Sequence, residues 1–295
     1  MKSGDVYDQI FRKALTLFTL TATAALASNA VNAATLEDIK KSGTVRIAVA
    51  NEIPYGYVDP SGEAKGAGPD VAKAIMAKLG IEKIEWVATN FSSLIPGLQA
   101  DRFDMVAAEM AILPDRCNQV LFSEPNTSYG EGLLVATGNP KDIHAFEDFA
   151  KKDGLKVAIM AGADQLEMMQ KLGVDEANLV TISANADAIS TVSTGRADAY
   201  AATSLTVGNL AQQSDGVELA TKFTDPVVDG EAVRSWGGFT FAKDNETLRD
   251  AVNQALVEVK KTDDWSKMVT SYGFTQSDLD GSLNRSTQEL CSPSN

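Results

Sequence analysis

The chain has 295 residues, of which 44% are hydrophobic and 22% are charged. This composition supports a packed core and argues against general disorder, and the length favours two lobes over one minimal domain. The formal net charge of -14 argues against a nucleic-acid partner, for which a basic surface is expected.

The first 33 residues have the order of a secretory signal peptide. Basic residues precede an uncharged stretch, 14–27, whose roughly 14 residues are too few to span a bilayer of about 30 Å. Small residues then end at Ala33 in an A-x-A-like pattern. A membrane anchor or a buried helix is the alternative, but no stop-transfer pattern follows. We therefore expect cleavage after Ala33 and export to the periplasm.

Cysteine and histidine are scarce in this chain. The two cysteines, Cys117 and Cys291, both follow the predicted cleavage point. In an exported protein two cysteines suggest one disulfide, with two free thiols as the alternative. The one histidine, His144, excludes a His-rich metal site and lies in a polar stretch typical of a surface loop. We expect no metal and no cofactor.

The first half of the mature chain alternates strands with helices. Apolar residues at every second position predict a strand at 45–49, and spacing of four predicts a helix at 71–79. Asp70 is a candidate cap for this helix and Gly80 a candidate terminator. The pattern continues with a strand at 84–86, a short helix at 94–100 and a strand at 103–108.

The same order recurs later in the chain. Strands are predicted at 157–160, 179–182 and 197–202, and helices at 164–172 and 186–194. This alternation predicts two α/β lobes, each a mostly parallel sheet flanked by helices. The terminal helices, near 248–260 and 265–272, have no sheet of their own, so we expect them to pack back on the first lobe. The chain would then cross between lobes twice, with a ligand cleft where strand ends meet.

These patterns define the expected domain organisation. Residues 1–33 are the signal peptide, 34–130 the first lobe, 131–235 the second lobe, and 236–295 the return to the first lobe with the C-terminal helices.

Five ordered segments resemble the amino-acid-type (family 3) extracellular solute-binding proteins of ABC importers. They are 50–57, 66–73, 91–99, 102–105 and 113–117. The resemblance covers essentially the whole mature chain. It implies the two-lobed type II periplasmic-binding-protein fold and a monomeric receptor without catalysis. Such a receptor hands a small solute to an inner-membrane ABC permease.

Within the family, the chain looks most similar to ectoine/hydroxyectoine-binding proteins. The Glu-x-x-aromatic of Glu52 and Tyr55, the Pro-x-Arg-Cys at 114–117 and the segment 198–206 carry this narrower match. It implies a small zwitterionic ligand, with ectoine or hydroxyectoine the predicted solute.

The resemblance also assigns roles in the first lobe. Arg116 takes the position of the arginine that grips a ligand carboxylate, which a guanidinium can bind bidentately. Glu52 would pair with a diffuse cation, while the faces of Tyr55 and Phe91 attract it by cation–π interaction. For each residue a structural role is the alternative: an arginine on a helix surface, a solvated loop acid, a core aromatic.

In the second lobe, Gly162, Ala163 and Asp164 precede a helix where the family binds a carboxylate. The hydroxyls usual at these positions are absent, and Asp164 could cap the helix or accept a cationic group. Thr203 stands where amino-acid binders commonly carry an acid for the α-ammonium, and this departure speaks against an ordinary α-amino acid.

A second departure involves Glu109 and Ala111, where the family usually has a small residue and a hydroxyl or aromatic. Ala111 removes a wall of an aromatic box. Glu109 adds charge, so either its side chain points away or the ligand is more cationic than ectoine.

Other functions stay open at this point. A dehydratase-like enzyme on the same fold could use Glu52, Glu109 or Asp164 as an acid or base. A receptor for a cationic amino acid and a sensor domain are further alternatives, and the absence of a predicted transmembrane helix after residue 272 argues against the sensor.

Overall fold

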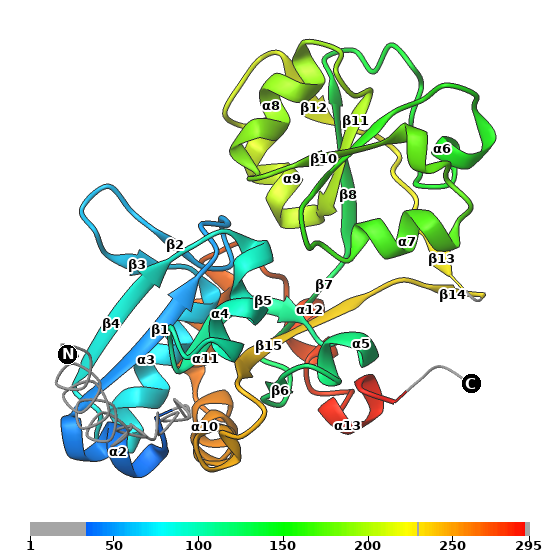
Figure 1. Cartoon of the computed structure of the whole chain (residues 1–295). Coiled ribbons are helices and arrows are strands. Elements are labelled where there is room, and N and C mark those ends of the chain that lie inside the picture. The colour runs from blue at the N-terminus through cyan, green and yellow to red at the C-terminus, as the bar shows by residue number, and fades with distance from the viewer. Residues whose placement is uncertain (1–33, 229, 293–295) are drawn as a thin grey trace, which may run out of the picture. The chain divides into compact units, whose positions relative to one another are not determined.

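The computed structural model describes residues 34–228 and 230–292, which form two main sheets with helices packed around them (Figure 1). The predicted signal peptide, 1–33, lies outside the described residues. Among the helices of the described part, none combines the length and the apolar character needed to cross a membrane.

The first sheet has six strands in the order β4-β1-β5-β15-β6, with β7 paired to β15. Their bounds are Thr44–Val49 (β1), Lys83–Ala88 (β4), Met105–Ala111 (β5), Leu121–Phe122 (β6), Thr127–Tyr129 (β7) and Ser235–Phe241 (β15). The second sheet has five strands in the order β10-β9-β11-β8-β12. Their bounds are Glu131–Ala136 (β8), Val157–Met160 (β9), Leu179–Ile182 (β10), Ala199–Thr203 (β11) and Val217–Leu219 (β12).

Two short hairpins and the helices complete the described part. The hairpin strands are Tyr57–Val58 (β2) with Ala64–Lys65 (β3), and Val227–Val228 (β13) with Glu231–Ala232 (β14). The helices are Leu36–Ser42 (α2), Ala67–Leu79 (α3), Phe91–Ser93 (η1), Leu94–Gln99 (α4), Pro114–Cys117 (α5), Asp148–Lys151 (α6), Gln165–Lys171 (α7), Glu176–Asn178 (η2), Ala186–Ser193 (α8), Ser204–Ala211 (α9), Glu246–Lys260 (α10), Asp263–Thr270 (α11), Gln276–Gly281 (α12) and Thr287–Leu290 (α13).

Both sheets are mixed rather than mostly parallel. The parallel pairs, β1 with β4 and β5, and β9 with β10 and β11, are those that alternating strands and helices predict. The strands that enter and leave each lobe pair antiparallel, β15 with β5 and β8 with β11. No crossover helix precedes these strands, so the alternation that predicts parallel pairing does not apply to them.

Helices cover both faces of the second sheet. Within β9, Ala158 belongs to a buried cluster with Val192 of α8 and Val207 of α9. The adjacent Ile159 belongs to a different cluster, with Met169 of α7. Successive strand residues point to opposite faces, so each face of β9 has its own layer of helices.

The C-terminal helices pack on the first sheet. Ile75 of α3, Val252 of α10 and Val269 of α11 share one buried cluster with Ile47 of β1. Figure 1 shows α3, α10 and α11 gathered beside β1. These helices therefore pack against the first sheet.

The start of α3 corrects one prediction. Gly66, not Asp70, is the N-cap, and the amides of Ala67 and Gly68 donate to the carbonyls of Pro54 and Tyr55. Because main-chain acceptors already satisfy this end, no side-chain cap is needed. Asp70 instead accepts a hydrogen bond from the Tyr272 hydroxyl at 2.6 Å. Gly80 does end the helix in the left-handed conformation, as predicted.

The two sheets are joined through strands that lie side by side. β7 leads directly into β8 of the second sheet, and β15 follows the return from it. β7 and β15 pair antiparallel, with Tyr129 opposite Ser235 and Thr127 opposite Gly237. The joint between the sheets is thus a two-stranded ribbon rather than two independent loops.

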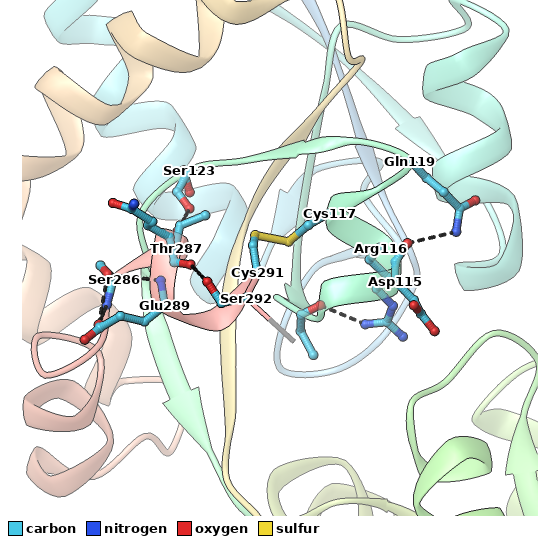
Figure 2. The surroundings of a disulfide bond; sticks show 12 residues. Asp115, Arg116, Cys117, Gln119, Ser123, Ser286, Thr287, Glu289, Cys291 and Ser292 are labelled. Atoms are coloured by element: carbon cyan, nitrogen blue, oxygen red, sulfur yellow. Dashed lines mark hydrogen bonds between the residues drawn. A yellow bond between two sulfur atoms is a disulfide. The ribbon is translucent and has the colours of Figure 1, made fainter. Parts of the chain in front are cut away.

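A disulfide links Cys117 at the end of α5 to Cys291 after α13, as predicted (Figure 2). The bond joins residues 174 positions apart in the sequence. It attaches the C-terminal segment to the short helix that carries Arg116, and Thr287 adds a hydrogen bond from its hydroxyl to the Ser123 carbonyl at 2.6 Å.

Replacing both cysteines by serine should lower the free energy of unfolding by about 2–5 kcal/mol, because the unfolded chain regains the freedom of a long loop. Urea denaturation of the oxidised wild type and the double variant measures the difference. Equal midpoints for the two proteins, with unchanged slopes, would contradict the expectation.

Candidate functional site

One cavity gathers most of the predicted site residues, and it is lined from both sheets. Its lining residues are Glu52, Tyr55, Phe91, Ala108, Glu109, Ala111, Tyr129, Met160, Ala163, Asp164, Gln165, Tyr200, Ala202 and Thr203. Six of the eight predicted ligand-binding residues are among them. Gly162 and Arg116 are not, but Gly162 is adjacent in sequence to Ala163, and Arg116 is hydrogen-bonded to Ala111.

Glu52 reaches this cavity from the loop after β1. Its side chain is buried, and Oε1 accepts a hydrogen bond from the Thr206 hydroxyl of α9 at 2.8 Å. Burial raises the pKa of Glu52, while hydrogen bonds from Thr206 and Asn185 act in the opposite direction. Glu52 therefore joins the first-sheet loop to the second sheet's helix, and it is not a solvated loop acid.

The two predicted aromatic residues occupy different settings. Tyr55 is buried and packs edge-to-face on Tyr129 and Phe274, with ring centroids 5.1 and 5.6 Å away. Within the described residues its hydroxyl has no hydrogen-bond partner. Phe91 lies under the guanidinium of Arg116, whose Cζ is 5.6 Å from the ring centroid. One face of Phe91 is thus engaged by the protein's own cation.

Arg116 sits on α5, directly after β5, and is buried rather than on a helix surface. One terminal nitrogen donates to the Ala111 carbonyl at 3.0 Å, and the other donates to the Gly162 carbonyl at 2.9 Å. The guanidinium has five N–H groups, so these two bonds leave donors for a carboxylate. Arg116 also links the first sheet to the turn that follows β9.

The turn from Gly162 to Asp164 differs from a simple anion site. The Ala163 amide already donates to the Met160 carbonyl at 3.0 Å. Asp164 stands at the N-cap of α7 without making a side-chain cap, and its Oδ2 accepts from the Ser235 hydroxyl of β15 at 3.3 Å. The capping role considered for Asp164 is therefore absent, and its carboxylate faces the cavity and the returning strand.

Thr203 is the last residue of β11 and the N-cap of α9. Its hydroxyl donates to the Thr206 hydroxyl at 3.0 Å, and Thr206 in turn donates to Glu52. Thr203 thus carries no charge to the cavity but belongs to a chain of hydroxyls that ends on Glu52.

Glu109 lines the cavity, yet its carboxylate is fully engaged within the first sheet. Oε1 accepts from the Asn126 side chain and Oε2 from the Thr127 hydroxyl, each at 2.6 Å. The Glu109 carbonyl accepts from the Tyr129 hydroxyl at 2.7 Å. Of the two possibilities raised by the sequence, these contacts favour a carboxylate directed to its own neighbours.

Glu109 has an unusual backbone for its residue type, with φ of 49°. The left-handed conformation costs roughly 1–2 kcal/mol for a residue with a side chain. Hydrogen bonds to a charged group contribute about 1.5–3 kcal/mol each, so the two bonds outweigh that cost. Burial raises the pKa of Glu109, and the bonds from Thr127 and Asn126 counter it.

Several cavity residues were not predicted from the sequence. They are Ala108, Met160, Gln165, Tyr129, Tyr200 and Ala202. Met160 is the last residue of β9 and Ala202 the last but one of β11, where the general rule for open α/β sheets places ligands, so that rule could have found both. Ala108 lies in the middle of β5, where that rule gives no signal. Tyr129 stands on the ribbon strand β7, whose pairing no sequence pattern revealed.

No cluster of three or more metal-binding side chains occurs in residues 34–228 and 230–292. The cavity instead combines carboxylates, aromatic rings, hydroxyls and one adjacent guanidinium. This set of groups suits reversible binding of a small polar molecule that carries both charges.

The sequence from 45 to 276 matches the family model of bacterial extracellular solute-binding proteins, family 3. The chain belongs to this family. A probable amino-acid ABC transporter periplasmic-binding protein of Sinorhizobium fredii, y4tE, is 55% identical over 269 residues, 90% of this chain and 89% of that protein. The chain is thus a solute-binding protein of an amino-acid-type ABC transporter.

Two solved structures resemble this solute-binding protein. EhuB in complex with hydroxyectoine has a TM-score of 0.79 at 28% identity, covering 88% of this chain and 98% of that chain. An ancestral amino acid-binding protein, described as a precursor of cyclohexadienyl dehydratase, has a TM-score of 0.69 at 30% identity, with coverages of 80% and 98%. Both support the two-lobed type II architecture.

Glu109→Ala should lower the free energy of unfolding by about 2–4 kcal/mol, because the buried Asn126 and Thr127 donors lose their acceptor. Glu109→Gly loses the same bonds but relieves the backbone strain, so it should be about 1 kcal/mol more stable than the alanine variant. Urea denaturation measures both. Glu82→Ala, at an exposed acid after α3, is the control. Wild-type stability of Glu109→Ala would show that these bonds contribute nothing.

Proposed function

We propose that this solute-binding protein is a periplasmic receptor for a small zwitterion, with ectoine or hydroxyectoine as the solute. After cleavage of the signal peptide it acts as a monomer, without catalysis, and delivers the solute to an inner-membrane ABC permease. The lobes are 34–130 with 236–295, and 131–235, and the ribbon of β7 and β15 is the hinge between them.

The arrangement of charges around the cavity carries this proposal. Arg116 lies on one side with donors to spare for a carboxylate, and Glu52 and Tyr55 line the cavity as partners for a cation. Thr203 provides no acid at the position where α-amino acid binders commonly hold an ammonium. A delocalised cation is better served by an aromatic ring together with an acid than by one point charge.

A receptor for a cationic amino acid is the second candidate. The excess of acidic over basic side chains around the cavity favours it. Three acids line the cavity, Glu52, Glu109 and Asp164, against the one adjacent arginine. Both oxygens of the Glu109 carboxylate already accept hydrogen bonds from Asn126 and Thr127, so Glu109 is less available to a ligand cation than Glu52 or Asp164. We rank the zwitterion first because the remaining acids then face one cation and Arg116 one carboxylate.

A dehydratase-like enzyme ranks below both receptors. Glu52 is a buried acid with a raised pKa, the property expected of a general acid, but it is already bound to Thr206. The neighbouring ancestral protein is itself described as amino acid-binding.

Calorimetry with ectoine, hydroxyectoine, proline betaine, L-histidine and L-arginine tests the ligand. We expect ectoine or hydroxyectoine to bind more tightly than either amino acid. A preference for L-arginine or L-histidine would refute the ectoine assignment while leaving the receptor role intact.

Arg116→Ala should weaken binding of the preferred solute by about 2–5 kcal/mol, because a buried carboxylate would lose its partner. The matched control is Arg196→Ala, at an exposed arginine after α8, which should bind like the wild type. A folded Arg116→Ala protein with wild-type affinity would place Arg116 outside the binding site.

A further inference from the structure

Glu131, the first residue of β8, stands beside the cavity without any role assigned so far. In the antiparallel pair of β8 with β11 it lies directly opposite Thr203. Directly opposed residues point to the same face of the sheet, with Cβ atoms about 4.5–5.5 Å apart. The Glu131 carboxylate therefore projects on the face where Thr203 lines the cavity.

The Glu131 carboxylate is buried but only half satisfied. The residue is 3% exposed, and Oε2 accepts from the Gln165 side chain at 2.7 Å. Oε1 is buried and finds no hydrogen-bond donor in the described part of the chain. The hydroxyl of Tyr55, which lines the same cavity, is unpartnered in the same way. Two orphaned polar atoms beside one cavity are costly unless a ligand supplies their partners.

The groups that face Glu131 are acids. Burial raises the pKa of Glu131 to about 8, and Asp164 before α7, Asp225 after β12 and Glu52 after β1 raise it too, against the hydrogen bond from Gln165. The phenols of Tyr55 and Tyr200 also lie within the range of its charge. Among the described residues, the groups with the largest influence on the pKa of Glu131 include no basic side chain.

We propose that Glu131 is a ligand-binding residue that accepts a hydrogen bond from the cation of the solute. It supplies, from the strand next to Thr203, the acid that position 203 lacks. This inference rests on the proposed receptor function and narrows its ligand. The cation must carry N–H groups, as an amidinium, guanidinium or ammonium does, because a quaternary ammonium has no hydrogen to donate to Oε1.

Binding of such a cation is linked to a proton. A nearby positive charge favours the ionised carboxylate, so the proton that Glu131 holds near neutral pH leaves to solvent when the cation binds. Affinity should then rise with pH from 6 toward 8, and the gain should end once the free protein is itself ionised.

Calorimetry of the mature protein at pH 6, 7 and 8 with ectoine, L-arginine and proline betaine tests the proposal. We expect the wild type to bind at least one of the two N–H cations more tightly than proline betaine, with affinity rising up to about tenfold per pH unit below the pKa. Glu131→Gln should weaken that binding by roughly tenfold or more at pH 8 and remove the pH dependence. Asp198→Asn removes an acid at the other end of β11, where Asp198 binds the Lys156 amide at 2.8 Å, and should keep the wild-type profile.

The possible outcomes separate this proposal from the ectoine assignment. Ectoine binding that is unchanged in Glu131→Gln, with the same pH profile, overturns the role of Glu131 and leaves the assignment standing. Binding of L-arginine but not ectoine, lost in Glu131→Gln, refutes the assignment and supports Glu131. A wild type that prefers proline betaine, or binds neither N–H cation, overturns the proposal.

A second measurement does not depend on the variant folding. Wild-type calorimetry in buffers of different ionisation enthalpy reports the protons released on binding. Net release at pH 7 is the expected result, and binding with no release contradicts it.

Discussion

The arrangement of the cavity depends on the hydrogen bonds between Glu109 and the ribbon of β7 and β15 that joins the two sheets. Its carboxylate holds Asn126 and Thr127, and its carbonyl holds the hydroxyl of Tyr129. The returning strand lies equally close, because a Cβ at Gly237 would come within 2.8 Å of the Glu109 carbonyl and Oε2. Both passages of the chain between the sheets therefore meet at one residue, and glycine at 237 permits that approach.

Around this fixed point, contacts from the two sheets converge on the cavity. Arg116 reaches the Gly162 carbonyl, and Thr206 reaches Glu52. The first bond fixes the guanidinium of Arg116 and the second fixes the carboxyl group of Glu52. Each bond connects an element of one sheet to an element of the other. Arg116 and Glu52, two of the predicted ligand-binding residues, thus also connect elements of the two sheets.

Much of the fold could be predicted because periodicity reports burial. The residues of β1, β4, β9 and β10 lie where the apolar patterns place them, and Gly80 ends α3 as a left-handed cap. The antiparallel pairing of β8 with β11 and of β15 with β5 could not be predicted, because a short apolar run does not indicate which strand it pairs with. The prediction of Asp70 as a cap was wrong for a related reason: the carbonyls of Pro54 and Tyr55, from a separate loop, accept the hydrogen bonds of the first helical amides.

The candidate site was predictable to the extent that it lies in recognisable segments. Glu52, Tyr55, Phe91 and Thr203 reach the cavity from such segments. Glu131 was missed because its neighbour is Thr203, far away in the sequence, and only strand register brings the two together. The engagement of Phe91 by Arg116 was equally hidden, since it depends on the path of the chain between them.

The side chain and the main chain of Ala111 make different contacts. The methyl group forms part of the cavity wall, whereas the carbonyl oxygen holds Arg116 at 3.0 Å. Every amino acid presents that carbonyl, so mutation at this position can reshape the wall while the arginine keeps its anchor. A single substitution at 111 can accordingly alter the shape of the wall while the guanidinium of Arg116 stays beside the cavity.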